Sequence, residues 1–161
     1  MKHSLLIFLL AISTVINSAS SCDRSGGPAS GSKKTESNND NKDTMNRKIK
    51  ISINSKTFTA TLLDNNSAKA LIEMLPMTIE MVELNGNEKF FDLSKNLPIN
   101  SSNPGIIKNG DIMLYGSRTL VLFYKAFSTS YSYTKIGSVE DTAGLATALG
   151  SGTIKVVFEA D

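Results

Sequence analysis

The chain has 161 residues, enough for one domain of ordinary size once its terminal segments are set aside. Its formal net charge is only +2, so it lacks the excess of basic residues that holds a phosphate backbone, and nucleic acid is excluded as a partner. The chain contains one histidine, His3, one cysteine, Cys22, and no tryptophan. A disulfide within the chain is therefore excluded.

The first 21 residues have the three parts of a secretory signal. Lys2 supplies the positive start, residues 5–16 are an apolar run, and residues 19–21 are small. The apolar run is shorter than the ~20 residues that a membrane-spanning helix needs. We therefore predict that residues 1–21 are a signal peptide that is cleaved on export.

Cys22 follows this segment directly, and a lone cysteine in an exported protein requires an explanation. Residues 19–22, Ala-Ser-Ser-Cys, resemble the bacterial lipobox, although Ala19 stands where lipoboxes usually have leucine. The resemblance implies that Cys22 is acylated, with palmitate-type chains, and that the protein is anchored to a membrane of the bacterial cell envelope. Each methylene buried in the bilayer contributes ~0.8 kcal/mol to membrane binding, so several acyl chains would hold the protein firmly on the membrane. The alternative is an ordinary secretory signal followed by a free thiol.

A polar segment separates this cysteine from the rest of the chain. Residues 23–47 are rich in Gly, Ser, Asn and charges of both signs, and contain almost nothing that can be buried. Such a composition is typical of a flexible tether, which at this length spans about 25–30 Å. We assign residues 22–47 to the lipidated cysteine and its tether, and residues 48–161 to a single folded domain.

The domain is expected to begin with a β-hairpin. Residues 48–54 and 57–62 alternate apolar and polar side chains, the pattern of half-buried strands, with Asn54-Ser55 as the turn. A short helix is expected next, within residues 64–76. It has Asp64, Asn65 and Asn66 as possible caps and Pro76 as its end, and its helically spaced apolar residues are Ala68, Leu71, Ile72 and Leu75.

Further strands are expected along the rest of the chain. Residues 77–84 and 87–93 flank Asn85-Gly86, a strong signal for a hairpin. Residues 111–116, 119–127, 133–139 and 153–160 also read as strands. A second short helix is expected within residues 139–150, where the apolar residues are Val139, Ala143, Leu145, Ala146 and Leu149 and Gly150 suits a helix end. The fold class is therefore mainly β, a closed barrel whose open ends are covered by two short helices.

Several kinds of chemistry are excluded by composition. Once His3 leaves with the signal peptide, no histidine remains to activate a serine or cysteine nucleophile, and zinc sites of the Cys/His type are likewise excluded. Glu80 and Glu83 are separated by an odd number of positions on an expected strand, so their side chains point to opposite faces and form a poor catalytic pair. No cofactor and no metal site is expected.

The folded part resembles a known family. The stretches "LPMTIEMVELNGNEKFFDL", "GDIMLYG" and "TSYSYTKIG" resemble cyclophilins, and more closely the bacterial cyclophilin-like domain proteins, often lipoproteins. The resemblance covers about residues 48–159. It implies a closed barrel of about eight strands with two capping helices.

The resemblance also bears on activity. Cyclophilin prolyl isomerases use an arginine on the strand after the first helix, with Phe, Gln, Trp and His lining a groove. Here that strand, residues 77–84, has no arginine, and Arg118 lies in a different turn. Without a cation placed to bond the proline nitrogen, the electrostatic stabilisation of the transition state is missing.

The resemblance places residues 126–137, "AFSTSYSYTKIG", beside the groove. Tyr131 and Tyr133 offer flat apolar faces with hydroxyl tips for gripping a peptide or a small molecule, or else one faces the barrel core and the other is solvated. Phe123 and Tyr124 must point oppositely on their strand, so one can line the groove. The candidate ligand-binding residues are Tyr131, Tyr133, Ser130, Thr129, Phe123 and Tyr124.

The expected function is a non-catalytic or weakly catalytic module that binds a peptide or small ligand at the envelope membrane. The alternatives left open are an envelope prolyl isomerase that assists protein folding, and a purely structural lipoprotein.

Overall fold

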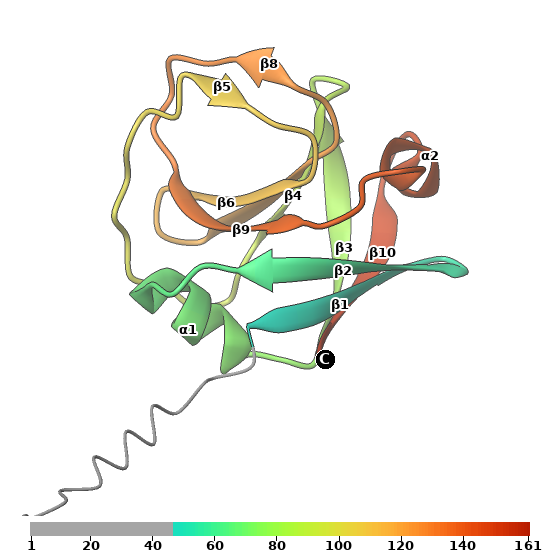
Figure 1. Cartoon of the computed structure of the whole chain (residues 1–161), viewed down its shortest axis with the longest axis horizontal. Helices are drawn as coiled ribbons and strands as arrows, with labels where there is room; N and C mark the ends of the chain where they lie inside the picture. Colours follow the sequence, from blue (N-terminus) through green and yellow to red (C-terminus); the bar gives the residue numbers. More distant parts are fainter. Residues whose placement is uncertain (1–46) are drawn as a thin grey trace, which may run out of the picture. The chain divides into compact units, whose positions relative to one another are not determined.

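The structure, a computed structural model, describes residues 47–161, and they form a closed antiparallel barrel of eight strands. Its strand order is β1-β10-β3-β4-β7-β6-β9-β2, with a separate two-stranded ribbon, β5-β8 (Figure 1). The predicted mainly β barrel with two short helices is thus confirmed. The predicted signal peptide, Cys22 and nearly all of the tether lie outside the described residues.

The elements follow one another with short connections, except for one long loop between β4 and β5. The strands are β1 (Lys48–Ile53), β2 (Lys56–Leu62), β3 (Met77–Leu84), β4 (Glu88–Asp92), β5 (Ile106–Ile107), β6 (Asp111–Tyr115), β7 (Thr119–Phe123), β8 (Phe127–Ser128), β9 (Thr134–Val139) and β10 (Ile154–Ala160), and the helices are α1 (Asn66–Ile72) and α2 (Leu145–Leu149). No helix in this part of the chain is long and apolar enough to cross a membrane.

Two tight turns fix the hairpins that the sequence predicts. Asn54 has φ 53° between β1 and β2, and Asn85 and Gly86 have φ 55° and 67° between β3 and β4. In the β3-β4 turn both central positions therefore have positive φ, the geometry of the turn that matches the twist of a hairpin. The β3-β4 turn places Leu84 opposite Glu88, which sets the register of every later pair on these strands.

The barrel closes where β2 pairs with β9, from Ala60 opposite Val139 to Leu62 opposite Gly137. Gly137 is required there, because an added Cβ would lie 2.5 Å from the Thr61 carbonyl oxygen. On its other side β9 pairs with β6, where the register shifts between Ile112 and Met113. Such a bulge bends a strand and increases its local twist, which a closed barrel needs.

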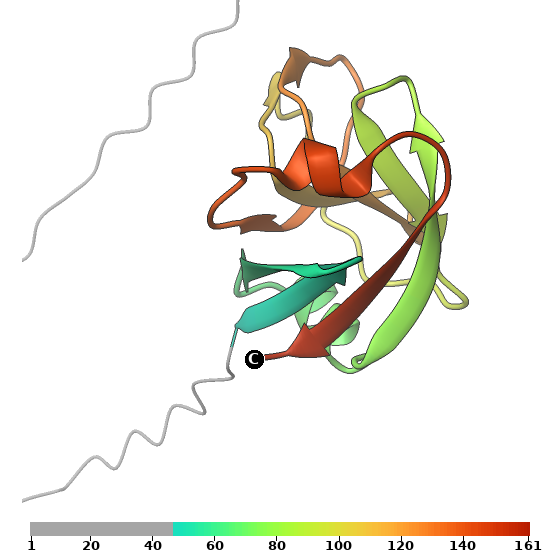
Figure 2. The ribbon, with the colours of Figure 1, turned by 90° about the vertical axis from the view of Figure 1, so that its right-hand side faces the viewer.

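The helices cover opposite ends of the barrel. Helix α1 follows β2, whereas α2 lies at the other end of the β1-β2 hairpin, where the Asn54 amide donates to the Ala148 carbonyl. Figure 2 shows α2 across the end that faces the viewer, with α1 behind β1 and β2. Their buried side chains join the barrel core: Ala68 and Leu71 from α1, Leu145 and Leu149 from α2.

Both helices are shorter than predicted. Helix α1 begins after Asn65, whose side chain accepts a hydrogen bond from the Ala68 amide, as a cap does, but it ends at Ile72 rather than near Leu75. Val139, which was predicted both as the end of a strand and as the start of the second helix, belongs to β9, and α2 starts only after Gly144, whose φ of 78° is incompatible with a helix. Likewise the strand predicted over residues 119–127 divides, because β7 ends at Phe123 and β8 begins at Phe127.

Strands β6 and β7 are buried on both faces. Inward-facing side chains, such as Leu120 and Leu122 of β7, join the barrel core. Outward-facing ones form a second, smaller cluster under the β5-β8 ribbon, which comprises Ile107, Met113, Val121, Phe123 and Tyr133, with Phe90 and Phe127 packed against it. The outer cluster creates a structured surface outside the barrel.

A buried lysine occupies the barrel wall between these layers. The Lys89 side chain is fully buried; its Nζ lies 2.6 Å from Glu83 Oε2 and donates to the Gly152 carbonyl oxygen at 2.6 Å. The Tyr124 hydroxyl donates to Glu83 Oε1 at 2.5 Å. Burial works to raise the pKa of Glu83, but the hydrogen bonds from Lys89 and Tyr124 outweigh it and lower that pKa overall. Burial, then the bond to Glu83, raises the pKa of Tyr124 to about 12.

We expect Lys89→Met to lower the free energy of unfolding by about 3 kcal/mol, because Glu83 loses the cation that compensates its burial. Replacing both residues, Lys89→Met with Glu83→Gln, should recover part of that loss. Urea denaturation measures both. The control is Lys155→Met on the exposed face of β10, which should change stability by less than ~0.5 kcal/mol. A loss no larger for Lys89 than for Lys155 would contradict the role of the ion pair.

Candidate ligand-binding pocket

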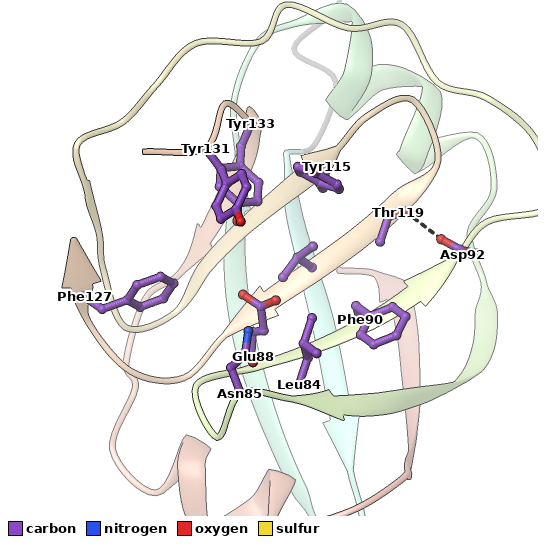
Figure 3. A pocket seen from close by; sticks show the side chains of 11 residues that line it. Leu84, Asn85, Glu88, Phe90, Asp92, Tyr115, Thr119, Phe127, Tyr131 and Tyr133 are labelled. Carbon is purple, nitrogen blue, oxygen red and sulfur yellow. Dashed lines mark hydrogen bonds between the residues drawn. The ribbon is translucent and has the colours of Figure 1, made fainter. Parts of the chain in front are cut away.

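A pocket of about 400 Å³ lies on the outer face of β4, β7 and β6, next to the outer cluster. Figure 3 shows it bounded by these strands on one side and by the segment that follows β8 on another. Its lining consists of Leu84, Asn85, Glu88, Phe90, Asp92, Tyr115, Thr119, Val121, Phe127, Tyr131 and Tyr133.

The floor of the pocket follows from strand geometry. Successive side chains of a strand point to opposite faces, so Glu88, Phe90 and Asp92 share the outer face of β4 while Lys89 points inward. The register places Phe90 opposite Val121 and Asp92 opposite Thr119 on β7. The floor is therefore apolar at its centre and carries a carboxyl group at each end.

Tyrosines form the wall above this floor. The ring of Tyr115, at the end of β6, lies 6.1 Å from that of Tyr131 in an edge-to-face arrangement and 5.6 Å from that of Tyr133, centroid to centroid. Tyr133 in turn meets the ring of Phe123 edge to face at 5.6 Å. These are favourable aromatic separations. The exposed pair at the pocket mouth thus rests on rings that belong to the outer cluster.

The backbone that carries these tyrosines is fixed on both sides. The Thr129 amide donates to the Gly105 carbonyl oxygen, and its hydroxyl accepts a hydrogen bond from the Tyr131 amide. Ser102 and Tyr133 exchange two backbone hydrogen bonds, each of 3.0 Å. The backbone of the tyrosine segment is therefore held against the long loop that precedes β5 without a ligand.

Glu88 is the buried polar side chain of the pocket. It is 7% exposed, and its carboxyl points from β4 into the pocket (Figure 3). No group in the described part of the chain donates a hydrogen bond to this carboxyl or pairs with it. Burial, with a smaller effect from the nearby charge of Glu83, raises its pKa. Burial and then the charge of Glu88 also raise the pKa of Tyr133.

Asp92, at the other end of the floor, has both a hydrogen-bond partner and an ion-pair partner. It accepts a hydrogen bond of 2.6 Å from the Thr119 hydroxyl, and the guanidinium of Arg118 lies 3.8 Å from its second oxygen. Both side chains of this ion pair are more than half exposed, so solvent screens it. The two carboxyl groups of the lining thus differ, since Asp92 has partners and Glu88 has none.

The structure separates the six candidate residues predicted from the sequence. Tyr131 and Tyr133 both line the pocket, and neither faces the barrel core. Phe123 and Tyr124 do point oppositely, but Phe123 supports the wall from the outer cluster and Tyr124 faces the barrel core. Thr129 orients the tyrosine segment and Ser130 is exposed, both outside the lining. Ligand binding by these residues stays a prediction.

Sequence reasoning missed Glu88, Phe90, Asp92 and Tyr115. The signal was present, because alternate residues of the expected strands at 87–93 and 111–116 must share a face. For Glu88 the sequence alone favours exposure, because a lone glutamate on a strand is ordinarily solvated. The opposite orientation predicted for Glu80 and Glu83 does hold, since Glu80 is exposed and Glu83 points toward Lys89.

The described residues contain no group of three or more His, Cys, Asp or Glu side chains that could hold a metal ion. The polar chemistry of the lining therefore comes from phenol hydroxyls, two carboxyl groups, the Asn85 carboxamide and the Thr119 hydroxyl, beside the aromatic faces.

A closed eight-stranded antiparallel barrel with a helix over each end defines the cyclophilin class of fold. The chain belongs to the Cyclophilin-like family, whose sequence profile matches residues 51–159. Among solved structures, it is similar in fold to the solution structure of the hypothetical protein AF2241 from Archaeoglobus fulgidus. That likeness has a TM-score of 0.52 at 16% identity and covers 72% of this chain and 95% of the other. No curated protein sequence matches this chain.

We expect Glu88→Gln to be more stable than the wild type at neutral pH. The folded wild type has a raised Glu88 pKa, so its stability falls as the pH rises from the ordinary value of 4.5 through the raised one, and the amide escapes this loss. Thermal unfolding across this range measures the difference in stability between the two proteins. That difference should be constant at low pH and grow above pH 4.5. Exposed Glu80 provides the control, Glu80→Gln. A difference independent of pH would count against the burial of a titrating carboxyl.

Proposed function

We propose that this protein is a non-catalytic or weakly catalytic binding module that holds a peptide segment or a small molecule in the pocket on the outer face of β4, β7 and β6. It works at the membrane of a bacterial cell envelope, to which the acylated Cys22 anchors it. The observation that carries the binding proposal is the pocket itself, with its apolar floor, its tyrosine wall and its unpaired buried carboxyl.

The dimensions and chemistry of the pocket support binding. A volume of about 400 Å³ lies within the range of small-ligand sites, which run from ~300 to ~1,000 Å³. Phe90, Val121 and Phe127 offer apolar contact, and Tyr115 and Tyr131 remain exposed at its mouth, at 48% and 62%. Large exposed aromatic side chains around a cavity are typical of recognition sites.

The charges of the lining favour binding over catalysis. A prolyl isomerase stabilises its transition state with a donor aimed at the proline nitrogen. The ionisable groups that line this pocket are the carboxyls of Glu88 and Asp92 and three phenols. Arg118 lies in the β6-β7 turn beside Asp92 rather than in the lining. The carboxyls accept hydrogen bonds, and the phenols offer ring faces and neutral O–H donors but no cation, which suits retention of a ligand better than polarisation of an amide.

We expect the mature protein to retain peptides from a fluorescently labelled library, and Tyr131→Ala to weaken that binding by about tenfold, the effect of removing one exposed aromatic contact. The matched control is Ile99→Ala, which removes an exposed apolar side chain outside the lining and should bind like the wild type. Fluorescence anisotropy measures the affinities.

A proline isomerisation assay runs beside the binding assay, on the same proteins. Catalysis near the uncatalysed rate is expected. Clear acceleration that Tyr131→Ala abolishes would establish the isomerase instead, and equal binding by all three proteins would remove the pocket from the function.

For the anchor, we expect wild-type protein to incorporate labelled fatty acid and to partition into detergent, and Cys22→Ser to do neither, because Cys22 is the only thiol in the chain. The variant's folded domain should keep its thermal unfolding midpoint, since residue 22 lies well before the first strand at Lys48. Equal fatty-acid labelling of both proteins would show that the lipobox interpretation is wrong.

A further inference from the structure

An unpaired buried carboxyl is unusual and calls for a partner. Glu88 is 93% buried as a residue, and no donor in residues 47–161 reaches its carboxyl oxygens, whose remaining contact is with the solvent of the pocket. Its neighbour Lys89 cannot serve, because the alternation of β4 directs that ammonium into the barrel, where it binds Glu83 and the Gly152 carbonyl. Burying a carboxylate without a partner costs free energy, so the pocket offers a place where an external cation would be stabilised.

The other charges near the pocket reinforce this bias. Burial is the main reason for the raised pKa of Glu88, and the negative charge of Glu83 on β3 adds to it. Asp92 contributes a second carboxyl to the lining, and no lysine or arginine belongs to it. Lys125, near the end of β7, has its Nζ 5.8 Å from the centroid of the Tyr124 ring, which belongs to the barrel core. The field within the pocket is therefore negative.

The aromatic wall adds ring faces, which attract a cation and also contact its apolar groups. Tyr115 and Tyr131 meet edge to face, so their ring planes lie 89° apart and form two sides of an open box. Ring faces attract cations within about 6 Å of their centroids, by ~0.5–2 kcal/mol each. Two rings at a right angle next to a buried carboxyl are suited to a cation that carries apolar groups, whereas the lining offers a metal ion only two carboxyls, Glu88 and Asp92, at opposite ends of the floor.

We propose that the pocket recognises an organic cation, a protonated alkyl amine or a guanidinium group, whose charge pairs with Glu88 and faces the rings of Tyr115 and Tyr131, and whose stem lies against Phe90. This inference rests on the proposed binding function and names the chemistry of the ligand. The group can belong to a lysine or arginine side chain of a peptide or to a free amine; the volume of about 400 Å³ leaves room for the atoms that flank it.

The test compares ligands that differ in charge but not in shape. The mature full-length protein in detergent is titrated with the Nα-acetyl methylamides of arginine and of uncharged citrulline, then with those of lysine and norleucine, while NMR follows the backbone amides of Glu88 and Tyr131. Each charged ligand should bind about five to ten times more tightly than its neutral counterpart. Pentylamine is the free-amine arm: binding as tight as that of the lysine compound indicates a free amine, and weaker binding indicates a peptide side chain.

Variants locate the effect in the pocket. Glu88→Gln should remove the preference for charged ligands, while Glu80→Gln, which deletes an exposed carboxyl elsewhere on the barrel, keeps it. Tyr131→Phe retains the ring and should retain the preference, whereas Tyr131→Leu should reduce it about fivefold. Since Glu88→Gln is expected to be folded, its unfolding midpoint is recorded beside each titration.

Two results would overturn the inference: equal affinities for arginine and citrulline compounds, or a preference that survives Glu88→Gln. An absence of shifts with every cation would overturn it as well. The proposed function stands or falls separately, on the peptide library and Tyr131→Ala, because a pocket that binds neutral peptides satisfies the proposal for function while contradicting the one for charge.

Discussion

The two-sided burial of β7 is the constraint on which the rest of this structure depends. Leu120 and Leu122 fill the barrel, while Val121 and Phe123 on the opposite face build the outer cluster. A strand that is apolar on both faces needs cover on both, and the β5-β8 ribbon with its flanking segments supplies the outer cover. Where that cover ends, beside the partly buried Phe90, the pocket begins. The pocket is thus the uncovered remainder of a face that is otherwise buried.

The same sheet keeps two glutamates in opposite electrostatic states. Glu83 points inward and has Lys89 and Tyr124 as partners, which lower its pKa, whereas Glu88 points outward without a partner and its pKa is raised, first by burial. Only the alternation of β3 and β4 about a tight turn determines which carboxyl receives the lysine. A shift of β4 by one residue against β3 would turn Lys89 outward and Glu88 inward and so separate Lys89 from Glu83; the Asn85-Gly86 turn therefore fixes the charge pattern as well as the strand register.

The sequence predicted most of the fold because its signals are local. Alternation identified the hairpins, and Asn54 and Asn85-Gly86 are at the turns expected of them. The lengths of the helices were overestimated, because the helical spacing of apolar residues extends beyond the helices themselves. Val139, for example, fits the spacing of the second helix but pairs with Ala60 in the barrel. Local periodicity cannot show whether such a residue will pair in a strand or belong to the neighbouring helix.

The pocket was predictable only in part, because it is assembled by long-range pairing. The tyrosine segment stands out in the sequence by composition, whereas Glu88 becomes unusual only when β7 and the ribbon bury it. The burial of Lys89 could not be predicted either, because its partners come from β3 and from the segment before β10. Closing a barrel brings such distant residues together, and their environment exists only in the folded chain.

The attachment of the tyrosine segment has a consequence for how such a domain diversifies. Tyr131 is carried by backbone hydrogen bonds from Thr129 to Gly105 and from Tyr133 to Ser102, so its side chain contributes little to the barrel core. Substitutions at positions 130–132 can therefore accumulate at small cost in folding free energy while they change the surface offered to a ligand. Evolution can vary ligand preference in that short stretch and leave the eight strands untouched, the division of labour that antibody loops have with their framework.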